Sequence, residues 1–127
     1  MENNDLTGKI IKAAYNVHNV LGAGFLEKVY HNAMLVELRL MGLEVESEYP
    51  INVVFKGVLV GEFFADLFVE DSIVVELKAV ENLLSIFEVK LVNYLQGTGN
   101  DIGLLINFGS SVEVKKKYRV YKKTIAD

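Results

Sequence analysis

The chain has 127 residues, no cysteine and a net charge of −4, and 51% of its residues are hydrophobic. A chain of this size and composition is expected to fold as one domain, residues 1–127, around a core that needs no cross-links. The absence of cysteine excludes disulfides and thiolate metal sites, and the acidic charge argues against a nucleic-acid binder that works by charge alone.

The sequence also indicates the cellular compartment of the protein. The first nine residues, MENNDLTGK, lack the basic start and apolar middle of a signal peptide. No apolar run reaches the ~18 residues that would span a bilayer. We therefore expect a cytoplasmic protein that does not contact a membrane.

Apolar residues recur at helical spacing over the first forty positions. The spacing predicts a helix over residues 6–21, which the glycines of GAG at 22–24 end, and a second helix from Phe25 to about Met41. The predicted buried stripes are Leu6, Ile10, Ala14, Val17 and Leu21 on the first helix, and Leu26, Val29, Ala33, Val36 and Leu40 on the second.

From residue 43 the pattern changes to strands. Runs at 44–55 and 58–70 flank Lys56 and Gly57, which predict a hairpin turn, and a third strand follows at 72–79. Helical spacing returns at 84–96 through Ile86, Val89, Val92 and Leu95. The run IGLLINF at 102–108 is typical of a strand buried on both faces, and residues 112–121 alternate as a last strand.

This order of elements predicts an α/β fold with a mixed β-sheet. The helix at 84–96 acts as a crossover, which makes the strands before and after it parallel. Pro50 predicts an edge or a bulge in the first strand. Six of the 13 basic residues lie in KKKYRVYKK at 115–123, which suits either a groove that follows a nucleic-acid backbone or a solvated edge strand protected by lysines.

Carboxylates interrupt two of the apolar strands. If residues 70–72 close a hairpin, residue 69 pairs with 73, and Asp66 faces Glu76 with Cβ atoms about 5 Å apart. Facing carboxylates repel, and Lys78, on the same face as Glu76, supplies only one positive charge. The pair suits a divalent cation such as Mg²⁺, which prefers oxygen ligands. A plain ion pair between Lys78 and one carboxylate is the alternative.

A third acidic residue begins the second helix. The stretch GFLEKVY at 24–30 puts Glu27 in the first turn, with Tyr30 and His31 on the same side. The helix dipole favours a glutamate there whether or not it has a function. His18 and His31 have no partner at metal-ligand spacing and are expected at the surface.

In these motifs the chain resembles the GxxExxY family of the PD-(D/E)xK nuclease superfamily. The resemblance runs from GFLEKVY through Asp66 and Glu76-Leu77-Lys78 to LLINFG at 104–109. It implies a restriction-endonuclease-like three-layer core, a mixed β-sheet flanked by helices. It also implies metal-dependent hydrolysis of phosphodiester bonds, with Mg²⁺ or Mn²⁺ as cofactor and nucleic acid, DNA in the first place, as partner.

The resemblance also implies roles for single residues. Glu27, Asp66, Glu76 and the backbone carbonyl of Leu77 would hold the metal, and Lys78 would be the catalytic lysine. Tyr30, Lys90 and Tyr94 would contact the substrate phosphate, although both tyrosines equally suit packing of a helix on the sheet. The helix at 84–96 departs from the family's pattern, because Phe87 and Lys90 stand where a histidine and a glutamine are usual.

The sequence is compatible with three functions. The first is a Mg²⁺-dependent nuclease, and the second is a catalytically degenerate protein that binds nucleic acid or a partner without cutting. The third is a homodimeric interaction module in which the carboxylates are incidental. Metal binding separates the third from the others, and cleavage separates the first from the second.

Overall fold

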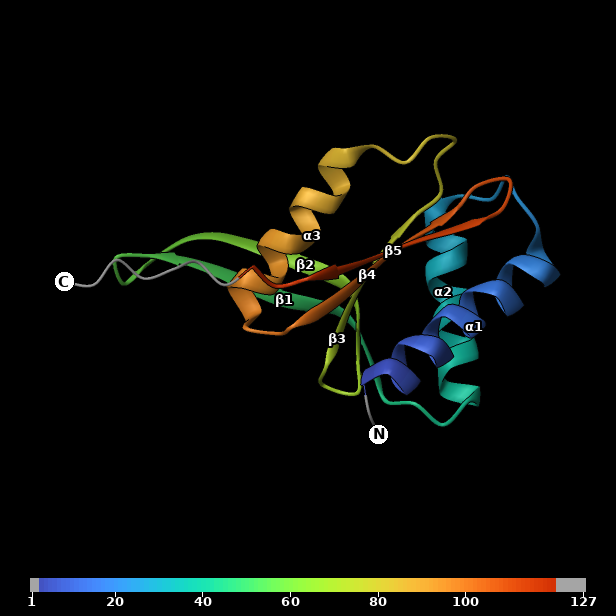
Figure 1. Ribbon diagram of the computed structural model, residues 1–127, viewed down its shortest axis with the longest axis horizontal. Coiled ribbons are helices and arrows are strands. Elements are labelled where there is room, and N and C mark those ends of the chain that lie inside the picture. The colour runs from blue at the N-terminus through green and yellow to red at the C-terminus, as the bar shows by residue number, and fades with distance from the viewer. Residues whose placement is uncertain (1–2, 121–127) are drawn as a thin grey trace.

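The computed structural model describes residues 3–120, which form three helices and five strands (Figure 1). The helices are α1 (Asn3–Leu21), α2 (Glu27–Leu40) and α3 (Ser85–Thr98). The strands are β1 (Val45–Phe55), β2 (Val58–Val69), β3 (Ile73–Lys78), β4 (Ile102–Phe108) and β5 (Val112–Tyr118). The predicted order of elements is confirmed.

The five strands form one mixed sheet in the order β1-β2-β3-β4-β5. Strands β3 and β4 are parallel and are joined by α3, whereas every other neighbouring pair is antiparallel. Helices α1 and α2 pack on one face and α3 on the other (Figure 1). The α/β fold with a mixed sheet flanked by helices is therefore confirmed, as is the crossover role of α3.

Two apolar cores lie on the two faces of the sheet. The larger contains the inward side chains of α1 and α2, and the smaller lies under α3. All seven residues of β4 are buried, as its continuous apolar run predicts. Gly103 in β4 leaves room for Leu91 of α3, because a Cβ added at this glycine would lie 2.8 Å from Leu91 Cδ1.

The predicted buried face is confirmed for α1 and wrong for α2. In α2 the buried residues are Tyr30, Met34 and Leu38, whereas Leu26 and Leu40 are 79% and 78% exposed. The true stripe is displaced by one residue, about 100° around the helix. Apolar residues lie on both sides of α2, and the buried Tyr30 decides which side faces the sheet.

The face predicted for α3 is also partly wrong. Leu95 is buried as expected, but Leu91 is the second buried residue, and Ile86 and Val89 are 49% and 53% exposed. Apolar residues surround this helix, so their spacing does not select one face.

The turns and the edges of the sheet agree with the sequence. Lys56 and Gly57 both have positive φ, 49° and 80°, as a two-residue hairpin turn between twisted strands requires. Strand β1, which contains Pro50, is one edge of the sheet, and β5 is the other. No helix among residues 3–120 is long and apolar enough to cross a membrane.

Candidate active site

The site is built where β2 and β3 separate. Their ladder runs from Val69↔Ile73 to Leu67↔Val75, which confirms the predicted register. At the next position side chains replace the strand-to-strand hydrogen bonds. The Asp66 N–H donates to Glu76 Oε1 at 3.1 Å, and the Leu77 N–H donates to Asp66 Oδ2 at 2.7 Å. Both carboxylates are thereby held in the fork between the strands.

The fork favours a proton on Glu76. Burial among apolar strand residues raises the pKa of Glu76 from 4.5 to about 8, and repulsion by Asp66 is the next cause. The hydrogen bond from the Asp66 backbone and the charge of Lys78 act in the opposite direction but do not outweigh these causes. At pH 7 and without a cation, the proton on Glu76 relieves the repulsion predicted from the sequence.

Lys78 follows on the same strand and is half-buried. Its Nζ lies over the Phe87 ring, 4.6 Å from the ring centroid, so α3 supplies an aromatic face for the ammonium group. Phe87, one of the two departures from the family's pattern, therefore contacts the residue that this pattern makes catalytic.

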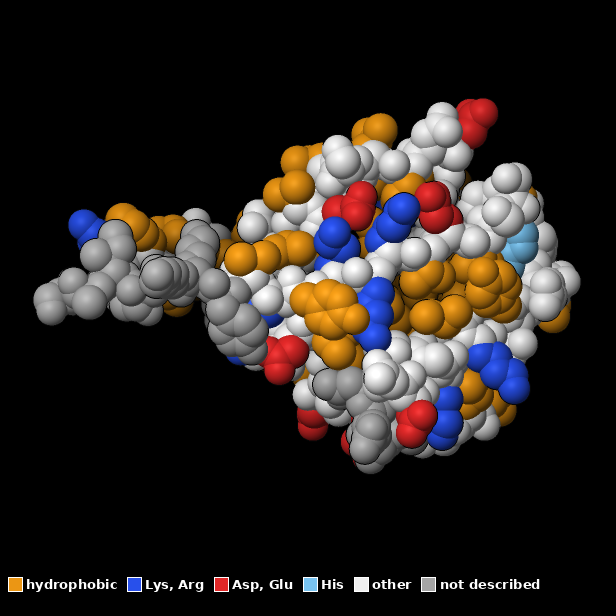
Figure 2. Space-filling model, viewed as in Figure 1, with side chains coloured by type: hydrophobic (Ala, Val, Ile, Leu, Met, Phe, Trp, Pro, Cys, Tyr) orange, Lys and Arg blue, Asp and Glu red, His pale blue; other side chains and the backbone are white. Residues whose placement is uncertain are grey.

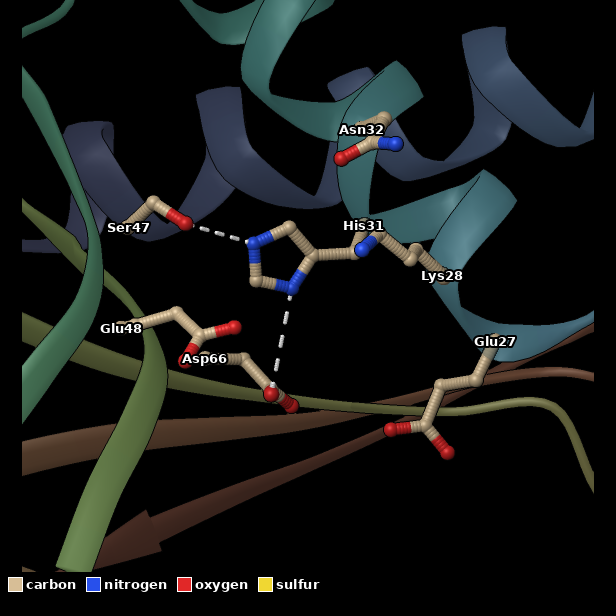
Figure 3. A pocket seen from close by; sticks show the side chains of 7 residues that line it. All are labelled: Glu27, Lys28, His31, Asn32, Ser47, Glu48 and Asp66. Atoms are coloured by element: carbon tan, nitrogen blue, oxygen red, sulfur yellow. Dashed lines mark hydrogen bonds and ion pairs between the residues drawn. The ribbon is translucent and has the colours of Figure 1, made fainter.

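Glu27 begins α2 and faces the same space. Desolvation raises the pKa of the Glu27 carboxyl, the charge of Lys78 lowers it, and the charge of Asp66 raises it. The Glu27 carboxyl is therefore close enough to the fork to interact electrostatically with Asp66 and Lys78. Figure 3 shows Glu27 at one end of a pocket of about 500 Å³ in which Asp66 also lies. Among residues 3–120, however, no three histidine or acidic side chains are gathered tightly enough to hold a metal ion.

Three other residues of this pocket were not predicted from the sequence. His31 Nε2 forms a 2.8 Å hydrogen bond with Ser47 Oγ, and His31 Nδ1 lies 3.9 Å from Asp66 Oδ1 (Figure 3). Glu48 has a φ of 56°, which is unusual for a residue with a side chain, and its neighbours in β1 pair with the residues on either side of Asp66. Helical spacing from Glu27 was a signal for His31, but nothing in the sequence marked Ser47 or Glu48.

The expectation that His31 stands free at the surface is therefore wrong, because its side chain connects α2 to the strands. His18 likewise is only partly exposed, since its Nε2 lies 2.8 Å from the Gly109 carbonyl oxygen and its ring stacks on Phe108.

Tyr30 has the packing role that the sequence left open. The side chain is fully buried and stacks on Phe108, with ring centroids 4.6 Å apart. Its hydroxyl donates to the Gly22 carbonyl at 2.6 Å and accepts from the Phe25 N–H at 3.2 Å. Contact between Tyr30 and substrate finds no support in this geometry. The residue instead fixes the loop that leads into Glu27.

Lys90 and Tyr94 lie on α3 and line a smaller pocket together with Glu76, Lys78 and Phe87. Lys90 is exposed, and in the part of the chain that the structure describes its side chain has no hydrogen bond or ion pair. Desolvation raises the pKa of Tyr94, and the charges of Glu76 and Asp66 raise it further, so the phenol faces the acidic pair.

The donor set fits a divalent cation. Asp66 and Glu76 offer adjacent carboxylate oxygens, and Glu76 holds at neutral pH a proton that a cation would replace. Glu27 shares one pocket with Asp66, and Glu76 lines the neighbouring pocket under α3. Mg²⁺ is commonly held by one or two carboxylates, with water or substrate phosphate completing its coordination, so a closed cage of three side chains is not required.

Basic residues in β5 and directly after it form ion pairs with acidic residues. Lys117 Nζ lies 3.2 Å from Glu88 Oε1, and Arg119 Nη2 lies 3.0 Å from Asp101 Oδ1. This pairing, together with the place of β5 at the sheet edge, favours the solvated edge strand over the groove. Lys122 and Lys123 lie outside the described residues.

Comparisons with known proteins agree with this architecture. A family model described as the PD-(D/E)XK nuclease superfamily matches residues 4–120. A solved structure titled "Crystal structure of SSO0001" is similar at a TM-score of 0.60 and 19% identity, over 75% of this chain and 50% of that chain. This chain thus spans about half the length of that protein, and the likeness shows the fold. No curated protein matches the chain.

Proposed function

Since the chain belongs to the PD-(D/E)XK nuclease superfamily, we propose that it is a metal-dependent nuclease of the GxxExxY family, acting in the cytoplasm on phosphodiester bonds of nucleic acid, DNA in the first place. The observation that carries the proposal is the pair Asp66 and Glu76, joined through backbone N–H groups in the fork and followed by Lys78. A fold that needed only an ion pair would not require a second, desolvated carboxylate beside the first.

Each residue of the site has one task in this proposal. Glu27, Asp66, Glu76 and the Leu77 carbonyl would hold Mg²⁺ or Mn²⁺, which would stabilise the charge that develops on the phosphate. Lys78 lies beside the carboxylates, where its ammonium group orients the attacking water or stabilises the same charge.

Residues of α3 extend the site toward the substrate. Lys90 would contact a phosphate through its exposed ammonium group, and the Tyr94 phenol, which lines the same pocket, would donate a hydrogen bond to it. Phe87 orients Lys78 through its ring face. Lys90 also supports a second candidate function, binding of nucleic acid without cleavage, because its positive charge shares a pocket with Glu76 and would compete with a cation there.

A cleavage assay with Mg²⁺ or Mn²⁺ on single- and double-stranded DNA and RNA tests the proposal. We expect cleavage by the wild-type protein and its loss in Lys78→Ala. Binding without cleavage under every condition would leave the second candidate and refute nuclease activity.

Calorimetry with Mn²⁺ tests the metal site separately. We expect heat of binding from the wild-type protein and from Lys78→Ala, since a protonated lysine is not a ligand, and its loss in Glu76→Ala. Equal heats from Glu76→Ala and wild type would mean that the site does not exist.

A further inference from the structure

The outer half of the β1–β2 hairpin exposes an unusual number of large apolar side chains. Between residues 51 and 65 only Lys56 and Glu62 are charged. We define the hairpin patch as the eight apolar residues of this segment that are 38–62% exposed, namely Val53, Val54, Phe55, Val58, Leu59, Val60, Phe63 and Phe64.

The two apolar cores do not account for the hairpin patch. The core under α3 takes in only Ile51 and Ala65 from this segment, at the base of the hairpin. The rest of the hairpin extends past α3 (Figure 1), and hydrophobic side chains are visible along the upper edge of the projecting end in Figure 2. A groove of about 840 Å³ between the hairpin and α3, lined by Val53, Phe63 and Val92 among others, continues the apolar surface.

The area of the hairpin patch suits a dimer. Large apolar side chains have ~150–200 Å² each, and about half of each of these is exposed, so the patch offers roughly 600–900 Å² per chain. A standard specific interface buries ~800 Å² per partner, and an ordinary monomer has no apolar patch larger than ~300–600 Å².

The shape and edge of the hairpin favour a second copy of this chain as the partner. Strand β1 is the edge of the sheet, so the backbone groups on its outer side have no strand partner among the described residues. Antiparallel pairing of β1 with β1 of a second copy would satisfy these groups around a twofold axis. Pro50 has no N–H to donate, which confines the pairing to residues 51–55.

We propose that the hairpin patch is the interface of a twofold-symmetric homodimer, in which the β1 edges pair and the apolar side chains of the two hairpins pack against each other beside the paired edges. The dimer does not depend on the proposed nuclease function, and its test uses no activity.

The test is the molar mass of the full chain by light scattering at several concentrations. The key variant is Val54→Glu with Leu59→Lys. These residues face each other across the hairpin, so opposite charges keep the pair within one chain compatible while placing charges in the interface. The matched control is Val36→Glu with Leu40→Lys, which are 60% and 78% exposed on α2 and one helical turn apart.

We expect wild type and control at twice the 14.2 kDa chain mass. The hairpin variant should be a monomer, its dissociation constant weakened about 100-fold or more. Circular dichroism confirms that each variant is folded, and the wild-type melting temperature should rise with concentration.

Two results would overturn the dimer. One is a wild type that stays monomeric at every soluble concentration with a melting temperature independent of concentration, which would assign the patch to another partner. The other is a folded hairpin variant that still dimerises, or a control that dissociates equally, which would place the interface elsewhere.

Discussion

Replacing Glu76 by glutamine should stabilise the protein when no metal is present. Glutamine keeps the shape of the protonated acid, and its amide can donate to Asp66 as the protonated carboxyl does. The pKa of Glu76 is raised from 4.5 to about 8, so at pH 7 the fold holds a proton that the unfolded chain has released. Holding it costs about 1.36 kcal/mol for each of the roughly 2.5 pH units between 4.5 and 7, or about 3 kcal/mol.

The partial exposure of Glu76 to solvent reduces this cost, and we expect a gain of about 1 to 3 kcal/mol for Glu76→Gln at pH 7. For a chain of this length that corresponds to a melting temperature higher by ~4–12 °C. The fold favours the protonated form of Glu76. The contribution of this group to the stability of the wild type is therefore fully present below pH 4.5 and is lost as the pH rises through about 8. The advantage of glutamine should therefore be small at pH 5 and largest at pH 9.

The assay is a thermal melt of both proteins at one concentration, in chelator and in Mg²⁺, at pH 5, 7 and 9. Added Mg²⁺ should stabilise the wild type, by ~2.7 kcal/mol at 100 times the dissociation constant, and leave Glu76→Gln nearly unchanged. Glu46→Gln, at an exposed position of β1, is the control, and its melting temperature should follow that of the wild type at every pH, with and without Mg²⁺. A Glu76→Gln protein that melts below wild type in chelator would refute the reasoning, because Glu76 would then serve as the ion-pair partner of Lys78.

Two further substitutions test contacts that the structure adds to the sequence. Phe87→Leu should lower the rate of cleavage about 3- to 30-fold and leave the heat of Mn²⁺ binding unchanged, because a cation–π contact is worth ~0.5–2 kcal/mol. Phe87→Tyr keeps an aromatic ring and should retain the wild-type rate. Equal cleavage rates in the two variants would show that the ring of Phe87 has no role in the mechanism. Gly103→Ala should destabilise the fold by about 1–3 kcal/mol in urea unfolding, since its Cβ would lie 2.8 Å from Leu91 Cδ1, whereas Gly8→Ala in α1, with open space around it, should be neutral or stabilising.

The sequence predicts those parts of the fold that depend on local patterns. The hairpin turns lie at Lys56–Gly57 and at 70–72, and counting back from the second turn places Asp66 beside Glu76. This works because strand pairing has a fixed period and a tight turn fixes its register. The closest pair of site residues was thus predictable without any tertiary contact.

The remainder depends on contacts between elements distant in the chain. The apolar residues of α2 lie on two sides, so the choice of face depends on Tyr30 reaching Gly22 and Phe108. The contact of His31 with Ser47 and the position of Phe87 under Lys78 depend on how the helices sit on the sheet. Spacing along the chain carries no information about such distances, and this is why these contacts were not predicted.

The fork links the proposed function and the fold at the same two acids. Where β2 and β3 separate, the N–H groups of Asp66 and Leu77 lose strand partners and are satisfied by the carboxylates of Glu76 and Asp66. Leaving a buried N–H without a partner costs ~1–3 kcal/mol. An alanine at either acid therefore removes a proposed metal ligand and also orphans a backbone donor, so lost activity in such a variant has two causes. Glutamine at position 76 keeps the acceptor oxygen and removes only the ability to ionise, and for this reason Glu76→Gln separates the proposed metal site from the structure that holds it.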